Sequence, residues 1–130
     1  MFYIFKKLLL PFNIISEFLL PQALVHGDSM YPTLVEGDVL RASRIPIIFR
    51  KFKVGSIYIF KSPKEDKLVI KRLTHIEENK LYFLGDNPCV SYDSRDYGLI
   101  EKKDVIAKVL YKCEDRGANN EENKCTKNRR

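Results

Sequence analysis

Short apolar stretches, separated by turn residues, follow one another from residue 22 to residue 113 and restrict the chain to a β-rich fold. The stretches alternate apolar with polar residues or are wholly apolar, which is typical of strands, and no helical segment separates them. This pattern predicts a mainly β fold, a small and bent antiparallel sheet or a partly closed barrel. The expected strands are Ala23–His26, Asp38–Ala42, Ser56–Lys61, Lys67–Ile76, Lys80–Leu84 and Val105–Lys112.

The fourth expected strand, Lys67–Ile76, carries a lysine among apolar residues. Side chains of a strand alternate between two faces, so Lys71 is expected beside Val69 and Leu73. Burial in apolar surroundings lowers the pKa of a lysine, which would allow this amine to act as a base near neutral pH. Arg72 points to the opposite face and keeps its proton. The two predicted sets are Val69, Lys71, Leu73 and His75 on one face and Leu68, Ile70, Arg72 and Thr74 on the other.

Residues 1–21 are apolar enough to raise the question of a membrane span. A spanning helix needs about 20 mostly apolar residues, but Lys6 and Lys7 interrupt the first run and Pro11 and Glu17 interrupt the second. We therefore predict no transmembrane helix, and no secretory signal, because a cleavage site of small residues is missing. The segment is expected to be a short amphipathic helix that either lies on a membrane or packs on its own domain.

Charge is unevenly distributed along the 130 residues. The chain has 23 Lys and Arg against 17 Asp and Glu, a net charge of +6, and residues 41–53 hold five basic residues and no acid. A nucleic acid, an anionic membrane or an acidic precursor would each suit this balance, and so would a solvated connecting loop. Residues 22–113 form the expected globular domain, and residues 114–130 are expected to be a disordered polar tail.

The cysteines have no spacing that indicates a disulfide framework or a metal site. Cys89, Cys113 and Cys125 are odd in number and form no C-x-x-C pair. Together with His26 and His75 they lack the spacing of a zinc finger. We expect free thiols, no metal and no other cofactor, and a cytoplasmic or peripherally membrane-associated protein.

Residues suited to catalysis gather in three short clusters. The clusters are residues 27–34 with Gly37-Asp38, residues 70–72, and residues 85–87 with residues 91–98. In residue types and order they resemble the three sequence boxes of the signal peptidase I family, serine endopeptidases that use a Ser/Lys dyad. The resemblance extends from about Leu24 to Val109 and implies the fold of that family's catalytic core for residues 22–113.

This resemblance implies a role for five residues. Ser29 would be the nucleophile and Lys71 its general base, since a serine hydroxyl needs a base within hydrogen-bond reach. Ser91 would be a hydroxyl partner of the lysine amine. Asp93 and Arg95 would form a supporting ion pair.

The residues around the serine would serve the oxyanion and the substrate. Backbone N–H groups of Gly27 and Ser29 are expected to stabilise the developing oxyanion. Many family members carry a serine where this chain has Gly27, so a side-chain donor is missing here. Met30 and Pro32, in the same box, are expected to contact substrate.

Three alternatives stay open at this point. A Ser/His pair would use His26 or His75, although His75 lies four residues beyond Lys71. A basic β-barrel that binds nucleic acid would suit the net charge, but most aromatic residues lie in strand-like runs. A self-cleaving repressor-type Ser/Lys protease would carry a helix-turn-helix before the serine, and no such pattern is found.

The compactness of the chain bears on the substrate. Residues 73–85 leave room for a single hairpin where membrane-bound preprotein peptidases commonly carry a longer β insertion. The chain thus resembles the compact branch that matures nickel-type superoxide dismutase by removing an N-terminal leader from a precursor. The alternative is a minimal signal peptidase that docks on a membrane through residues 1–21 and cleaves secretory preproteins.

Overall fold

A computed structural model describes residues 14–113 and 125–127, and almost all of its regular structure is strand. Its strands confirm the mainly β prediction, with bounds within two residues of those expected. The strands are β1 Gln22–Leu24, β2 Val39–Ser43, β3 Ile57–Lys61, β4 Leu68–Glu77, β5 Lys80–Leu84, β6 Ile100–Glu101, β7 Val105–Cys113 and β8 Cys125–Lys127. The short helices are α2 Ile45–Ile48, α3 Ser94–Tyr97 and a 3-10 turn, η1, at Lys102–Asp104.

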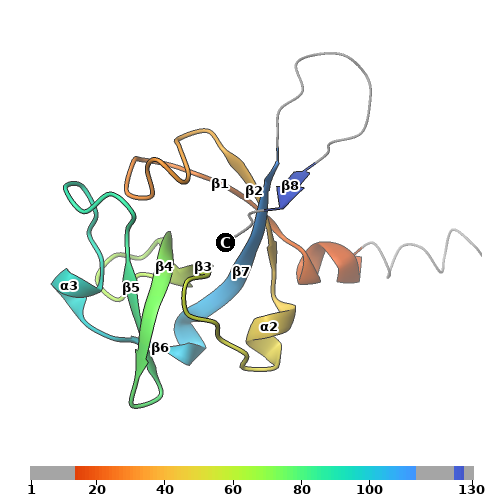
Figure 1. The fold of residues 1–130 in the computed structure, drawn as a ribbon. Coiled ribbons are helices and arrows are strands. Elements are labelled where there is room, and N and C mark those ends of the chain that lie inside the picture. The colour runs from red at the N-terminus through yellow and green to blue at the C-terminus, as the bar shows by residue number, and fades with distance from the viewer. Residues whose placement is uncertain (1–13, 114–124, 128–130) are drawn as a thin grey trace, which may run out of the picture.

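All strands belong to one antiparallel sheet in the order β1-β2-β7-β3-β4-β5-β6, with β8 paired to β7. Strand β7 therefore joins two parts of the sheet, β1 and β2 on one side and β3 to β6 on the other, and Figure 1 shows it passing through the middle of the molecule. The sheet does not close into a barrel among the described residues. The bent, open sheet agrees with the first of the two predicted forms.

Two apolar clusters form the core. The first combines β1, β2, β3 and β7 with three side chains from the loop after β1, Val25, Met30 and Leu34, which are almost fully buried. The second surrounds Tyr58, Phe60 and Phe83 on β3 and β5. The ring centroids of Phe60 and Phe83 lie 4.4 Å apart in a stacked arrangement. Burial of these side chains supplies the apolar stabilisation that holds the two parts of the sheet together.

The alternation expected for β4 holds only as far as Leu73. Lys71 and Leu73 are buried, as predicted. His75 is exposed instead and stacks on the ring of Tyr82 at a centroid distance of 4.5 Å. The cause is a shift in the β4–β5 register between Leu73 and His75, because such an irregularity re-aims the side chains beyond it.

The two ends of the chain are only partly described. Residues 14–19 are helical, and among the described residues no helix is long and apolar enough to cross a membrane. The part of the expected amphipathic helix in residues 1–13 lies outside the described residues, as does most of the expected tail. Within that tail, residues 125–127 form β8 on the edge of β7. The segment at residues 41–53, which could have been a plain loop, contains α2.

Candidate active site

Ser29 lies in the loop between β1 and β2, and this loop is anchored on both sides of the serine. Before the serine, Val25 is buried in the first core cluster, and Gly27 adopts a φ of +78°, a conformation that favours glycine. After the serine, Met30 is buried in the first core cluster, and Leu34 follows it there. The hydroxyl of Ser29 is thus held by a loop whose neighbouring side chains are packed into the core.

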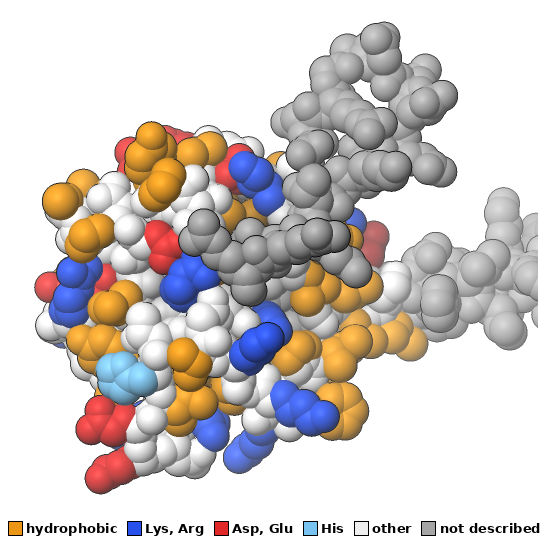
Figure 2. Space-filling model, in the orientation of Figure 1, with side chains coloured by type: hydrophobic (Ala, Val, Ile, Leu, Met, Phe, Trp, Pro, Cys, Tyr) orange, Lys and Arg blue, Asp and Glu red, His pale blue; other side chains and the backbone are white. Residues whose placement is uncertain are grey.

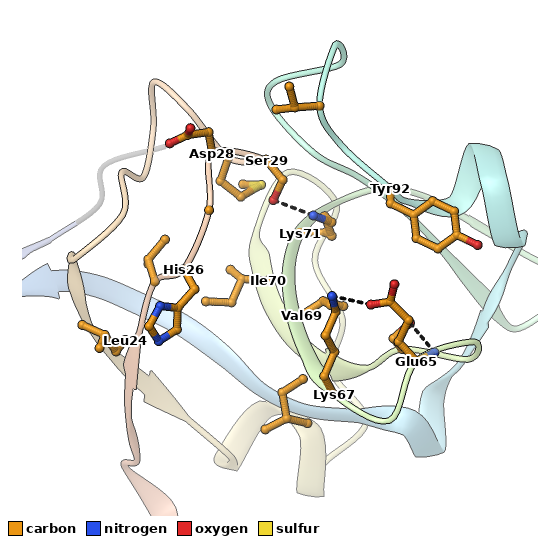
Figure 3. A pocket seen from close by; sticks show the side chains of 16 residues that line it. Leu24, His26, Asp28, Ser29, Glu65, Lys67, Val69, Ile70, Lys71 and Tyr92 are labelled. Carbon is orange, nitrogen blue, oxygen red and sulfur yellow. Dashed lines mark hydrogen bonds and ion pairs between the residues drawn. The ribbon is translucent and has the colours of Figure 1, made fainter.

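Lys71 reaches the serine from β4. Its side chain is buried, at 4% exposed, and its Nζ lies 2.6 Å from the Oγ of Ser29. Figure 3 shows the two side chains pointing at each other across the rim of a pocket. Burial lowers the pKa of Lys71; the carboxylate of Asp93 opposes this change, and the nearby ammonium of Lys67 adds to it.

Arg72, the next residue on β4, binds the loop after β5. Its Nε and Nη2 donate to the two carboxylate oxygens of Asp86 at 2.9 and 2.7 Å, and its Nη1 donates to the carbonyl of Gly55 at 2.7 Å. The hydroxyl of Thr33, from the serine loop, donates to the same carboxylate at 2.5 Å. A planar guanidinium matches a carboxylate in this two-bonded form, so Asp86 connects β4 to the serine loop.

The loop after β5 also contacts the serine directly. The backbone N–H of Asn87 donates to the carbonyl of Ser29 at 2.9 Å, and its side-chain amide donates to the carbonyl of Asp28 at 3.1 Å. Gly85 precedes this contact. A Cβ at Gly85 would lie 2.0 Å from the Oγ of Ser91 and 2.6 Å from the carbonyl oxygen of Ser29. The chain therefore needs a glycine here for the two loops to approach.

Asp93 is fully buried and accepts hydrogen bonds from three directions. Its donors are the hydroxyl of Ser91 at 2.7 Å, the backbone N–H of Gly85 at 2.9 Å, and the guanidinium of Arg95 at 2.9 and 3.0 Å. Burial alone would raise the pKa of Asp93, but the hydrogen bonds from Arg95, Gly85 and Ser91 together hold it far below its usual range. Asp93 also caps α3 through the N–H of Arg95.

Ser91 differs in its partner from the expected arrangement. Its hydroxyl donates to Asp93, whereas the hydrogen bond that Lys71 makes is with Ser29. Ser91 thus orients the carboxylate behind the lysine. The ion pair expected between Asp93 and Arg95 is present.

A pocket of about 400 Å³ opens beside Ser29 and Lys71. Gly27 and Met30 line it, and the exposed Pro32 lies outside its lining. His26 lines its edge with a side chain that is 77% exposed, and the solvent-exposed His75 is not part of it. Its walls come from β1, the serine loop, the β3–β4 turn, β4 and the loop after β5. The apolar members are Leu24, Val25, Leu68, Val69, Ile70 and Val90, and the polar or aromatic members are Ser62, Glu65, Lys67 and Tyr92.

Sequence reasoning missed the part played by Asp86, Asn87 and Thr33. The sequence carried one usable signal, since Arg72 and Asp86 bear opposite charges and each belongs to one of the three boxes. Pairing them required the strand register, which places Arg72 opposite Leu84 on β5. No cluster of three or more possible metal ligands occurs in residues 14–113 and 125–127.

Comparisons with known proteins place the chain among peptidases. Residues 2–76 and 73–113 match the family described as signal peptidase, peptidase S26. A relative in Arabidopsis thaliana, mitochondrial ATP-independent inner membrane protease subunit 1a, is 28% identical over 131 residues, covering 82% of this chain and 78% of the relative. Thylakoidal processing peptidase 1, chloroplastic, from the same plant, is 23% identical over 136 residues; the match spans 68% of this chain and 40% of that protein.

The family match covers far more than half of the chain and includes the serine loop, β4 and the loop after β5. It agrees with the resemblance drawn from the three sequence boxes and with the mainly β, open antiparallel sheet. The chain belongs to the signal peptidase S26 family of peptidases.

Proposed function

We propose that this protein is a serine endopeptidase that uses Ser29 and Lys71 as a dyad to remove an N-terminal leader from a precursor protein. The observation that carries the proposal is the 2.6 Å contact between the Oγ of Ser29 and the Nζ of a buried Lys71. Burial lowers the pKa of this lysine, and a neutral amine is the form that can accept the serine proton. The exposed His75 and the edge position of His26 favour the lysine over a Ser/His pair.

The reaction follows from this geometry. As the Oγ of Ser29 attacks the scissile carbonyl carbon, the neutral Lys71 takes the hydroxyl proton. Backbone N–H groups of Gly27 and Ser29 are proposed to stabilise the resulting oxyanion, without a side-chain donor at Gly27. The ammonium of Lys71 then protonates the leaving amine as the peptide bond breaks. Water hydrolyses the acyl-enzyme, with Lys71 as base again, and Ser29 regains its proton.

The residues behind the dyad are proposed to keep Lys71 in place. Asp93 remains ionised because its hydrogen bonds lower its pKa. Ser91 and Arg95 both donate to this carboxylate and fix its position. In the substrate pocket, Met30 is proposed to contact the leader, and Pro32 is proposed to do so beyond the pocket wall.

Two precursor classes are proposed as substrates. The curated relatives are an inner membrane protease subunit and a thylakoidal processing peptidase, and their names favour a precursor processed at a membrane. The compact hairpin formed by β4 and β5 favours the second class, the precursor of a nickel-type superoxide dismutase. Both reactions are cleavage of a leader by the same dyad.

Co-expression with each precursor, followed by intact-mass measurement, tests the proposal. Wild type is expected to shorten one precursor by its leader, whereas Ser29→Ala and Lys71→Ala are expected to leave it whole. Lys64→Ala, which changes an exposed lysine of the β3–β4 turn, and His75→Ala serve as matched controls and should cleave as wild type does. Full cleavage by both Ser29→Ala and Lys71→Ala would exclude the dyad.

A further inference from the structure

The pairing of β8 with β7 brings two of the three cysteines together. Cys113 and Cys125 are Cα partners in the register of this antiparallel pair, and Figure 1 shows β8 beside the end of β7. Their spacing in the sequence gives no sign of this, because strand register is a tertiary property. The fold thus places two thiol-bearing residues directly opposite each other.

The backbone geometry of such a pair suits a disulfide. Cα atoms of directly opposite residues in an antiparallel ladder lie about 4.5–5.5 Å apart, within the range of about 4.4–6.8 Å found for disulfides. Opposite side chains leave the sheet on the same face, with Cβ atoms about 4.5–5.5 Å apart, whereas a disulfide needs about 3.5–4.5 Å. Closure therefore needs an approach of at most about 1 Å in a typical ladder, which is a small shift for β8, a strand of three residues.

Cys113 also stands in a row of opposed residues that crosses four strands. The row runs through Leu24, Val39, Cys113 and Cys125, from β1 through β2 and β7 to β8. At its other end, Leu24 lines the pocket beside Ser29. A covalent bond at Cys113 would therefore fasten β8 to the part of the sheet from which the serine loop emerges.

We propose that Cys113 and Cys125 form a reversible disulfide by exchange with glutathione disulfide. One cysteine thiolate attacks glutathione disulfide, forms a mixed disulfide and releases one glutathione. The second cysteine attacks the protein sulfur of this mixed disulfide and releases the other glutathione. The two cysteine thiols lose two electrons and two protons, and glutathione disulfide gains them to become two thiols. Cys113 is only partly buried, so a dissolved reagent can reach it.

The charge of the protein suits this oxidant. Glutathione disulfide carries more carboxylates than ammonium groups, whereas the chain has a net charge of +6. Figure 2 shows Lys and Arg side chains spread over the face in view. Lys112, the neighbour of Cys113, forms an ion pair with Asp38 at 3.5 Å and its side chain remains 39% exposed. A basic surface raises the local concentration of an anion, so glutathione disulfide is a suitable probe.

Equilibration of the full chain with mixtures of reduced and oxidised glutathione tests the proposal. After an acid quench, alkylation and intact mass count the remaining thiols, and peptide mapping without reduction identifies the bonded pair. We expect the equilibrium constant for the Cys113–Cys125 bond to be at least about tenfold larger in the native protein than in urea, because only the folded chain holds the two residues opposite each other. The measurement requires no turnover, so its result is independent of the proposed peptidase reaction.

Exchange of two neighbouring residues provides the sharpest variant. Cys125→Thr/Thr126→Cys keeps the composition and moves the cysteine by one position, which turns its side chain to the other face of β8. We expect its constant in the native protein to fall to the value in urea, while the value in urea stays as in wild type. Cys89→Ser is the control, since Cys89 is exposed in the loop after β5, and its constants should equal those of wild type.

Three results would overturn the proposal. Equal constants in the native protein and in urea would mean that sequence proximity alone accounts for the bond. Native wild type and the Cys125→Thr/Thr126→Cys variant with the same constant would show that the register has no part in it. A native protein in which Cys89 is the bonded partner of Cys113 or Cys125 would exclude the assigned pair.

Discussion

Replacement of Gly85 by alanine would insert a methyl group between the two loops that form the site. The new Cβ would meet the carbonyl oxygen of Ser29 at 2.6 Å and the Cβ of Ser91 at 2.5 Å. Ordinary contact begins near 3.4 Å, so the Ser29 carbonyl would have to withdraw by about 0.8 Å. The Oγ of Ser91 can rotate away, but the backbone carbonyl of Ser29 moves only with its loop.

This displacement is large compared with the positional tolerance expected of the proposed dyad. The Oγ of Ser29 lies 2.6 Å from the Nζ of Lys71, and a misplacement of about 1 Å costs on the order of 100-fold in rate. We therefore expect kcat/KM of Gly85→Ala for a leader peptide to fall about 100-fold. The free energy of unfolding should fall by about 1–3 kcal/mol, the usual cost of overpacking.

Peptide cleavage followed by mass spectrometry, together with urea denaturation, measures both effects. Gly37→Ala is the matched control, because its φ is +91° and nothing lies within 4 Å of its Cβ position. This control should lose about 1 kcal/mol of stability through backbone strain and keep its kcat/KM. A folded Gly85→Ala protein with kcat/KM within about twofold of wild type would refute the reasoning that the contact positions Ser29.

Three further predictions concern the charged groups of the site. The kcat/KM of wild type should rise with pH as Lys71 loses its proton. Because burial lowers the pKa of Lys71, the rise should level off at a pH below the usual lysine pKa. A profile that is flat from about pH 5 to 9 would contradict a lysine base. Asp93→Asn should lower the free energy of unfolding by about 2 kcal/mol in urea titrations, less than for a fully buried pair, because Arg95 stays partly in solvent. The pKa of Asp93 is lower in the folded chain than in the unfolded chain, so the unfolded chain binds more protons once pH falls into the usual carboxyl range. The stability that Asp93 contributes should therefore decline progressively from that range downward, and an Asp93→Asn variant that loses stability to acid as steeply as wild type would speak against it. Arg72→Lys should lose the two-bonded contact with Asp86, and its kcat should fall about tenfold at an unchanged KM. A variant with a higher KM and an unchanged kcat would instead place Arg72 in substrate binding.

The sequence predicted the strands well because their alternation is a local property. The six expected strands appear as β1 to β5 and β7. The two-residue β6 was missed, since Ile100–Glu101 is too short to show any period. Helix α2 was missed because its four residues, Ile45–Ile48, are all apolar, so the segment shows no alternation between an apolar and a polar helix face.

The candidate site was predictable only in part. The boxes indicated Ser29 and Lys71, which the fold brings together from 42 residues apart. The partner of Arg72 depends on the β4–β5 register, and the solvent position of His75 depends on a register shift in the same pair of strands. Both are tertiary properties that no local pattern encodes.

The position of β7 in the sheet has a consequence for the timing of activity during synthesis. Ser29 follows β1, whereas Lys71 lies on β4, and β7 is the strand that pairs with both β2 and β3. A nascent chain that ends before Val105 lacks this strand and so cannot join the two parts of the sheet. We therefore expect activity to appear only after β7 has been synthesised, because Ser29 and Lys71, the proposed nucleophile and base, are both translated before the strand that pairs with each part of the sheet.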